Sequence, residues 1–242
     1  MHLDPVAAYD RIAPRFARLS YLRRPYLDQV ERVVIDSLPP EARSLLDVGA
    51  GDGSRSLRIA RQCRIARLVL LEPSAAMRGP VLPGIVTWAM RAEELSRVQE
   101  QFDAITCLWN VLGHISARGD VLRHFARLLN AGGLLFVDVS HRYNAREYGV
   151  ARTLLRCLHD CIRPDERNGD VVVNWDTCST TGHVFTDREF RALAEAAGLA
   201  IRRRVAIDYT SGKIQRSLYM GHLLYIMERK AAATSSISSS RS

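Results

Sequence analysis

The sequence lacks the features that identify membrane, secreted and zinc-binding proteins. No apolar run reaches the roughly 20 residues that a transmembrane helix needs, so no membrane partner is expected. The N-terminus shows no basic segment followed by an apolar stretch, so no signal peptide is predicted. The five cysteines are odd in number, and Cys157 and Cys161 have no second pair, so no metal site is predicted. We therefore expect a cytoplasmic protein.

Lysine is also nearly absent, because all but two of the 34 basic residues are arginines. The formal net charge of +8 would ordinarily suggest a nucleic-acid partner. An arginine excess beside abundant Ala and Leu can instead reflect coding composition, and no basic motif interleaved with aromatic residues is found. The run Arg202-Arg203-Arg204 begins an expected strand, where alternation divides it between two faces. We predict no nucleic-acid partner.

The stretch from Ser44 to Ser56 is the most informative part of the chain. An apolar run ends in Asp47, glycines follow at positions 49, 51 and 53, and a segment of helical character begins. A strand, a Gly-rich turn and a helix bring backbone N–H groups close to a ligand, and a Cβ would block that approach. The glycine spacing does not fit the dinucleotide fingerprint G-x-G-x-x-G, and no Gly-Lys-Ser/Thr follows. Nicotinamide, flavin and Walker-type sites are therefore disfavoured.

A second carboxylate, Glu72, ends the next apolar run at residues 66–71. In a βαβ unit a carboxylate at this distance can accept hydrogen bonds from ribose hydroxyls. A charged residue can also end a strand because the chain emerges there into solvent. The correctly placed upstream turn favours the ribose role.

Residues 45–53 together with Glu72 resemble the S-adenosylmethionine site of the class I methyltransferases. Three further stretches agree, namely 91–95 beside the adenine, 102–115 beneath the methionine moiety, and 128–137 around the fifth strand. The adenine segment departs from the family, because it opens with Arg91 in place of the usual Asp. The resemblance implies that the cofactor contacts Tyr9, Arg15, Asp47, Gly49, Ala50, Gly51, Glu72, Pro73, Ala92, Glu93, Trp109 and Asn110.

Apolar strands that alternate with helices predict an α/β fold with a doubly wound sheet covered on both faces. Together with the resemblance, this pattern predicts a mostly parallel seven-stranded sheet whose last strand is antiparallel. The expected strands lie near 44–48, 67–72, 85–89, 102–108, 133–139, 200–209 and 217–229, and the expected helices near 54–62, 92–97, 117–130 and 187–197. We predict one methyltransferase domain over 1–230 and a disordered Ser-rich tail over 231–242.

Two segments are expected to cover the site. Within the N-terminal helices of residues 1–40, one helix at 5–20 is predicted to break near Pro14, and a second spans 22–38. By the family resemblance the first helix forms a lid, although Tyr9 and its neighbours also fit a simple apolar helix face. Residues 140–186 interrupt the repeat after the fifth strand, with a helix at 145–163 and strands at 171–178 and 182–186, and are interpreted as a substrate cover.

Catalytic residues are weakly encoded, because methyl transfer mainly requires positioning of the acceptor. His114 follows the fourth strand and is a candidate general base or a structural cap. His141 and Tyr143, just past the fifth strand, are similar candidates, and His183 is a further one. We predict methyl transfer to a small-molecule acceptor. An RNA methyltransferase and a non-catalytic S-adenosylmethionine-binding protein are the alternatives, and the sequence predicts no oligomeric state.

Overall fold

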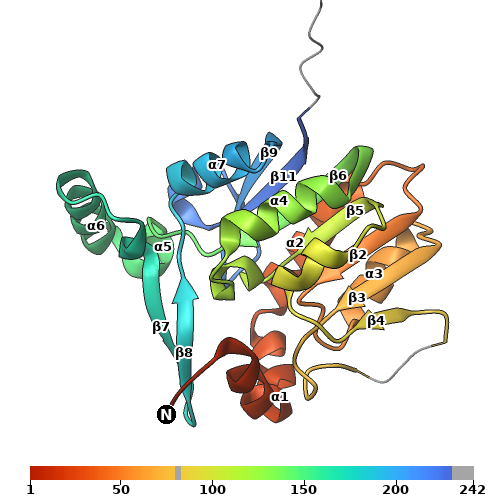
Figure 1. The fold of residues 1–242 in the computed structure, drawn as a ribbon. Helices are drawn as coiled ribbons and strands as arrows, with labels where there is room; N and C mark the ends of the chain where they lie inside the picture. The colour runs from red at the N-terminus through yellow and green to blue at the C-terminus, as the bar shows by residue number, and fades with distance from the viewer. Residues whose placement is uncertain (80–82, 231–242) are drawn as a thin grey trace, which may run out of the picture.

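The computed structural model describes residues 1–79 and 83–230, so the predicted Ser-rich tail at 231–242 lies outside the described residues. An eight-stranded sheet runs through the molecule in the order β10-β9-β11-β6-β5-β2-β3-β4 (Figure 1). Its strands are β2 (Ser44–Val48), β3 (Arg67–Leu71), β4 (Val86–Trp88), β5 (Phe102–Cys107), β6 (Leu129–Val139), β9 (Leu199–Ile207), β10 (Ile214–Gln215) and β11 (His222–Arg229).

The predicted doubly wound, mostly parallel sheet is confirmed. Strands β4, β3, β2, β5 and β6 pair in parallel, and β11 runs antiparallel between β6 and β9. All seven predicted strands are present, and the two-residue β10 is an eighth that the sequence analysis did not predict. It pairs with the end of β9 after a turn at Gly212, and so short a strand leaves no periodic signal.

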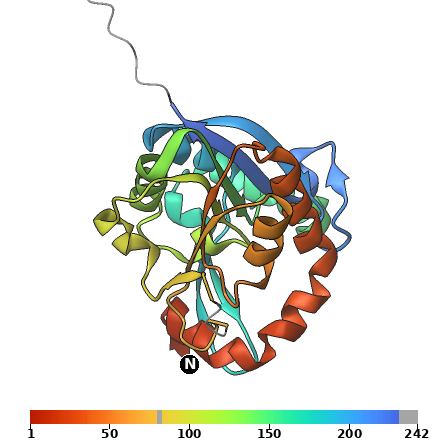
Figure 2. The same ribbon diagram turned by 90° about the vertical axis from the view of Figure 1, so that its right-hand side faces the viewer.

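Helices cover both faces of the sheet, as Figure 2 shows. One face carries α4 (Arg118–Leu128) and α7 (Asp187–Ala196), which bury Phe125 and Phe190 in the larger apolar cluster. The other face carries α2 (Arg24–Ser37) and α3 (Ser54–Gln62), which bury Tyr26 and Ile59 in a second cluster. Because both faces are buried, the central strands are apolar along their whole length.

The N-terminal helix α1 (Pro5–Leu22) corrects one prediction, since it continues through Pro14 instead of breaking there. Proline removes one backbone hydrogen bond from a helix. Here Ala8 and Ile12 before the proline, and Phe16 after it, belong to the same apolar cluster. Tertiary packing on both sides of Pro14 therefore holds the helix in one piece.

The segment after β6 forms a separate small lobe, at the left of Figure 1. It contains α5 (Ala145–Tyr148), α6 (Val150–Ile162), the 3₁₀ turn η3 (Glu166–Gly169), β7 (Asp170–Asn174) and β8 (Ser179–His183). The predicted single helix over 145–163 was wrong, because Gly149 adopts a positive φ of 83° between α5 and α6. One side of α6 is open to solvent and carries exposed Val150, Leu154, Leu155, Leu158 and Ile162.

The hairpin of this lobe also differs from the prediction. Thr180, Thr181 and Gly182 lie inside β8, and the turn lies at 175–178, where the Trp175 N–H donates to the Cys178 carbonyl over 2.8 Å. The two-residue strand β1 (His2–Leu3) pairs in parallel with β8 and completes a three-stranded sheet. This pairing could not be predicted, because it joins segments more than 170 residues apart.

Smaller corrections concern the ends of elements. The predicted helix at 92–97 is the 3₁₀ turn η1 (Ala92–Arg97), and β6 begins at Leu129, four residues earlier than expected. The last strand begins at His222, because Ser217 caps a preceding 3₁₀ turn, η4 (Leu218–Met220). Among the helices of the described residues, none combines the length and the apolar character that crossing a bilayer requires.

Candidate functional site

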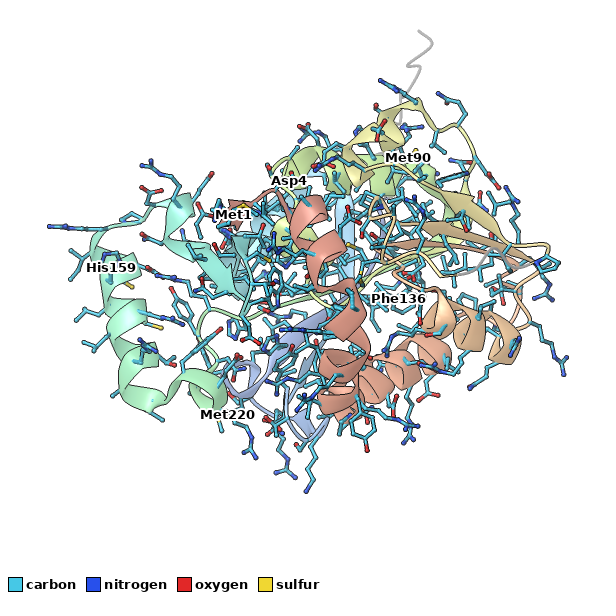
Figure 3. The ribbon with its side chains drawn as sticks, turned by 90° about the horizontal axis from the view of Figure 1, so that it is seen from below. Met1, Asp4, Met90, Phe136, His159 and Met220 are labelled. Carbon is cyan, nitrogen blue, oxygen red and sulfur yellow. The ribbon has the colours of Figure 1, made fainter. Side chains whose placement is uncertain are left out.

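A cavity of about 790 Å³ lies at the carboxyl ends of the parallel strands. The chain winds outward from β2 through β3 to β4 and then returns to place β5 on the other side of β2. Open α/β sheets bind ligands at such a switch point. Figure 3 shows α1 running between the lobe and the sheet. Residues of the lobe and of the sheet line the cavity. Helix α1 contributes Val6, Tyr9, Ala13, Phe16 and Leu19 to the lining.

The Gly-rich turn forms one wall of the cavity. Gly49, Gly51 and Gly53 have φ angles of 75°, 56° and 71°, a region that glycine adopts without strain. The N–H groups of Gly49 and Ala50 both donate to the Leu71 carbonyl, which fixes the turn against β3. A Cβ at Gly49 would collide with Val111 at 2.4 Å. A Cβ at Gly51 would meet only Met77, at 3.7 Å, so space beside this backbone is open to a ligand.

The carboxylate of Glu72 lines the same wall. Oε2 accepts the Gly51 N–H and Oε1 accepts the Ser74 N–H, each over 2.9 Å. Glu72 is 8% exposed, and burial raises its pKa while these backbone hydrogen bonds lower it. Each oxygen keeps a second lone pair, since a carboxylate offers about four acceptor positions. The carboxylate can therefore accept two further hydrogen bonds from a ligand in the cavity.

Asp47 also lines the cavity, and each of its oxygens accepts one hydroxyl group. One accepts the Ser56 hydroxyl and the other accepts the Thr106 hydroxyl over 2.6 Å. Burial raises the pKa of this carboxyl, and the two hydrogen bonds act in the opposite direction. Asp47 therefore ties β2 to α3 and β5 beneath the turn.

Trp109 and Asn110 follow β5 with left-handed φ angles of 62° and 57°. The Asn110 side-chain oxygen accepts the Ser140 N–H over 2.9 Å, which joins the ends of β5 and β6. The indole N–H of Trp109 donates to the Tyr209 hydroxyl over 3.0 Å. Both residues line the cavity, so the turn is shaped around a ligand position.

The departure at Arg91 has a structural explanation. Its guanidinium donates to Asp4 over 2.7 Å, which connects the adenine segment to the residue that precedes α1. Ala92 and Glu93 line the cavity beside Arg91, and Pro73 lines it next to Glu72. Arg91 therefore connects this wall of the cavity to the start of its covering helix.

Tyr9 and His114 meet above the end of β5. Nδ1 of His114 lies 3.0 Å from the Thr181 carbonyl, which can only accept, so this nitrogen carries the proton. Nε2 therefore accepts the Tyr9 hydroxyl, over 3.2 Å. Burial lowers the pKa of His114 and keeps its ring neutral. Both ring nitrogens are engaged, so neither is free to take a proton from an acceptor.

Four sequence candidates lie outside the cavity lining. Arg15 points away and pairs with Asp176 over 3.3 Å. His141 is buried with no hydrogen-bond partner for either ring nitrogen, and burial lowers its pKa to about 4. Tyr143 donates to Asp160 over 2.8 Å. His183 lies between Asp170 and Glu189.

Four further residues line the part of the cavity that lies away from Glu72, and they were not predicted from the sequence: Arg23, Asp138, Tyr209 and His222. They come from the α1–α2 junction and from the ends of β6, β9 and β11. The predicted antiparallel direction of the last strand was the signal that could have found His222. An antiparallel strand begins at the edge where its parallel neighbours end.

Comparisons with known proteins agree with this geometry. A family model described as a methyltransferase domain matches residues 18–203. A ubiquinone biosynthesis O-methyltransferase of Aeromonas salmonicida is 25% identical over 86% of this chain and 85% of the relative. A dTDP-4-amino-2,3,4,6-tetradeoxy-D-glucose N,N-dimethyltransferase of Saccharopolyspora spinosa is 27% identical over 66% of this chain and 72% of the relative.

Among solved structures, the S-adenosylmethionine-bound amino pentose methyltransferase CalS10 of Micromonospora echinaspora superposes with a TM-score of 0.57. It shares 19% identity, and the match covers 89% of this chain and 97% of CalS10. The fold is therefore shared. Since the family model spans most of the sequence and the cavity carries the free acceptors of Glu72 beside the open backbone at Gly51, the chain belongs to the class I S-adenosylmethionine-dependent methyltransferases.

Proposed function

We propose that the protein transfers the methyl group of S-adenosylmethionine to a small-molecule acceptor inside the cavity. The observation that carries this proposal is a single cavity that continues from Glu72 to His222. These residues lie at strands four positions apart, which corresponds to roughly 19 Å across the sheet. The volume of about 790 Å³ falls within the range typical of small-molecule sites.

The residues at the two ends suggest how the cavity is divided. Glu72, Ala92 and Glu93 would hold the nucleoside of the cofactor. Gly49, Ala50 and Gly51 would lie along the methionine part of the cofactor. Trp109 and Asn110 would lie beside the methyl group. When bound, the cofactor supplies a methyl group on a sulfonium, and the protein positions the acceptor and excludes water. The acceptor would then occupy the space toward Tyr209 and His222.

The covers support a small acceptor over a nucleic acid. Helix α1 is tied across the cavity by Asp4 at Arg91 and by Asp10, which accepts the Ser74 hydroxyl over 2.6 Å. The tip of the β7–β8 hairpin contributes Trp175 to the lining. An acceptor enclosed by these segments has to be small. The ubiquinone and amino-sugar enzymes among the relatives, by their names, act on small molecules too.

The cysteines support a cytoplasmic location. All five lie among the described residues and are free thiols. Free cysteines are typical of a reducing compartment.

Transfer of a labelled methyl group tests the proposal. Purified protein is incubated with S-adenosylmethionine labelled on its methyl group and with a cell extract divided by ultrafiltration into small molecules and macromolecules. We expect label only in the small-molecule fraction, and less of it with the Glu72→Ala variant when the cofactor is supplied below saturation. Label in nuclease-sensitive material would contradict the proposal, as would binding of the cofactor without any transfer.

A further inference from the structure

We propose that His222, paired with Glu147, is the general base that removes the proton from an aromatic hydroxyl acceptor. This inference rests on the proposed function, because it places the acceptor at the His222 end of the cavity. His222 is the first residue of β11 and is 5% exposed. It lines the cavity, and Glu147 of α5 lies outside the lining on the other side of the ring.

The hydrogen bond between the two residues fixes which nitrogen can act as a base. Nε2 of His222 lies 2.7 Å from Oε2 of Glu147, and a carboxylate can only accept. The neutral ring therefore carries its proton on Nε2 and keeps a lone pair on Nδ1. No hydrogen bond to Nδ1 is found among the described residues, unlike the two engaged nitrogens of His114. An imidazole with one oriented and one free nitrogen is the arrangement that general-base catalysis needs.

Acidic side chains flank the His222 ring. Two carboxylates face His222, Glu147 from α5 and Asp138 from the end of β6. The other titratable groups around it are Tyr26, Tyr209, His141 and, beyond Glu147, Arg23. The side chain of Glu147 is 34% exposed, so the pair also connects the buried ring to solvent. A proton taken from the acceptor can leave by this route.

Asp138 is a weaker candidate for the base. It lines the cavity, and burial raises its pKa. However, one of its oxygens accepts the Tyr26 hydroxyl and the other accepts the Asn110 N–H over 3.3 Å. These contacts hold the carboxylate as a structural link between α2 and the turn after β5.

The walls next to His222 indicate an aromatic acceptor. The His222 ring stacks on Tyr209, with centroids 4.4 Å apart and an angle of 20°. The Arg23 guanidinium lies 4.2 Å from the same Tyr209 ring, on the lining of the cavity. Trp109 and Phe16 add two more aromatic rings, 4.9 Å apart. A planar ring can stack among these side chains, and Arg23 offers a positive charge to a phenolate oxygen.

The proposed step is a proton transfer coupled to displacement. Nδ1 of His222 accepts the hydroxyl proton while the acceptor oxygen forms a bond to the methyl carbon. The carbon–sulfur bond breaks and its electron pair stays on sulfur. Phenolic hydroxyls ionise near pH 10, as tyrosine does, so at neutral pH a base is required for a fast reaction.

A coloured phenol tests the inference without requiring turnover. 4-Nitrocatechol is titrated into the protein saturated with S-adenosylhomocysteine, and the absorbance of its anion is followed against pH. We expect the bound phenol to ionise at least about one pH unit below the free phenol, because the imidazolium and Arg23 favour the anion. His222→Gln should abolish this shift, and His159→Gln, on the exposed face of α6, should retain it.

Methylation of catechol supplies the second measurement. His222→Gln should lower kcat by 10²- to 10⁴-fold, the usual contribution of a general base, with little change in KM or in affinity for S-adenosylhomocysteine. Glu147→Gln should reduce kcat and move the acid limb of the kcat/KM profile to lower pH, because the imidazolium loses its anionic partner. A purely structural role for Glu147 would not move this limb.

The outcomes separate this inference from the proposed function. The inference would be overturned if kcat for catechol methylation in His222→Gln stayed within about threefold of the wild-type value and bound 4-nitrocatechol ionised at the same pH in both proteins. The proposed function would then remain intact. Transfer to an amino sugar but to neither phenol would overturn the hydroxyl assignment. If the wild-type protein does not bind S-adenosylhomocysteine, the proposed function itself is overturned.

Discussion

The hydroxyl of Tyr9 donates to Nε2 of His114 over 3.2 Å, while Nδ1 of the same ring donates to the Thr181 carbonyl over 3.0 Å. One histidine thereby joins three segments that are remote in sequence, namely α1, the turn after β5, and β8. The Tyr9 ring also packs edge to face against Trp175. These contacts hold α1, the turn after β5 and the β7–β8 hairpin against one another beside the cavity.

Removal of this hydrogen bond should loosen the cover. In Tyr9→Phe the ring still packs, and the loss of about 0.5–1.5 kcal/mol should accelerate amide exchange in α1 and β8 by about 2- to 10-fold in the S-adenosylhomocysteine complex. Hydrogen–deuterium exchange with mass spectrometry measures this. Tyr21→Phe, at an exposed position of the same helix, is the matched control. Equal exchange with and without ligand in the wild-type protein would indicate a fixed cover instead of a closing one.

Glu72 should supply much of the cofactor affinity. We expect Glu72→Ala to weaken S-adenosylmethionine binding by about 1.5–3 kcal/mol, or about 10- to 150-fold, because hydrogen bonds to a charged acceptor are lost. Isothermal titration calorimetry gives the value. Glu100→Ala removes a surface pair with Arg67 and should leave the affinity unchanged. Wild-type affinity in Glu72→Ala would refute the ribose assignment.

His141 should make the fold sensitive to acid. Burial lowers its folded pKa to about 4 from the usual value of 6.5, so as pH falls below 6.5 the unfolded chain binds a proton that the folded protein does not. This residue alone should reduce the free energy of unfolding by up to about 3 kcal/mol between pH 6.5 and 4.

Denaturant unfolding at several pH values checks the size of this loss. His141→Phe keeps an aromatic ring among Tyr143 and Tyr219 but cannot titrate, so its stability should fall less across the same window. His159→Gln, which changes an exposed ring, should follow the wild-type curve. If the free energy of unfolding falls with pH equally in wild type and His141→Phe, protonation of His141 does not destabilise the folded protein.

Nucleic acid should bind only weakly despite the net charge of +8. Some arginines of the described surface pair with carboxylates, as in Arg67–Glu100 and Arg204–Asp187, which reduces the positive potential available to phosphates. In a filter-binding assay we expect weak association that falls steeply as salt is raised. Sequence- or structure-selective binding of RNA at physiological salt would contradict this prediction.

Much of the fold and the Glu72 end of the cavity could be predicted from the sequence. Gly49, Gly51 and Gly53 sit where the backbone needs a positive φ, and Glu72 ends the next strand, so both signals are local. The alternation of apolar strands and helices likewise reports burial on two faces of a sheet. Such features depend on neighbours within about 25 residues, which a sequence pattern records directly.

The His222 end of the cavity was decided by tertiary structure. His141 and Tyr143 follow β6 in the chain, yet they turn away from the cavity into the lobe, where Tyr143 binds Asp160. His222 and Tyr209 come from strands β11 and β9, and they meet Arg23 of the N-terminal helices across almost 200 residues of sequence. The sequence by itself determined where a turn can bend and where a strand ends. Only the pairing of distant strands and the packing of the lobe decided which side chains share the cavity, because those contacts depend on the positions of whole elements and not on the spacing of residues along the chain.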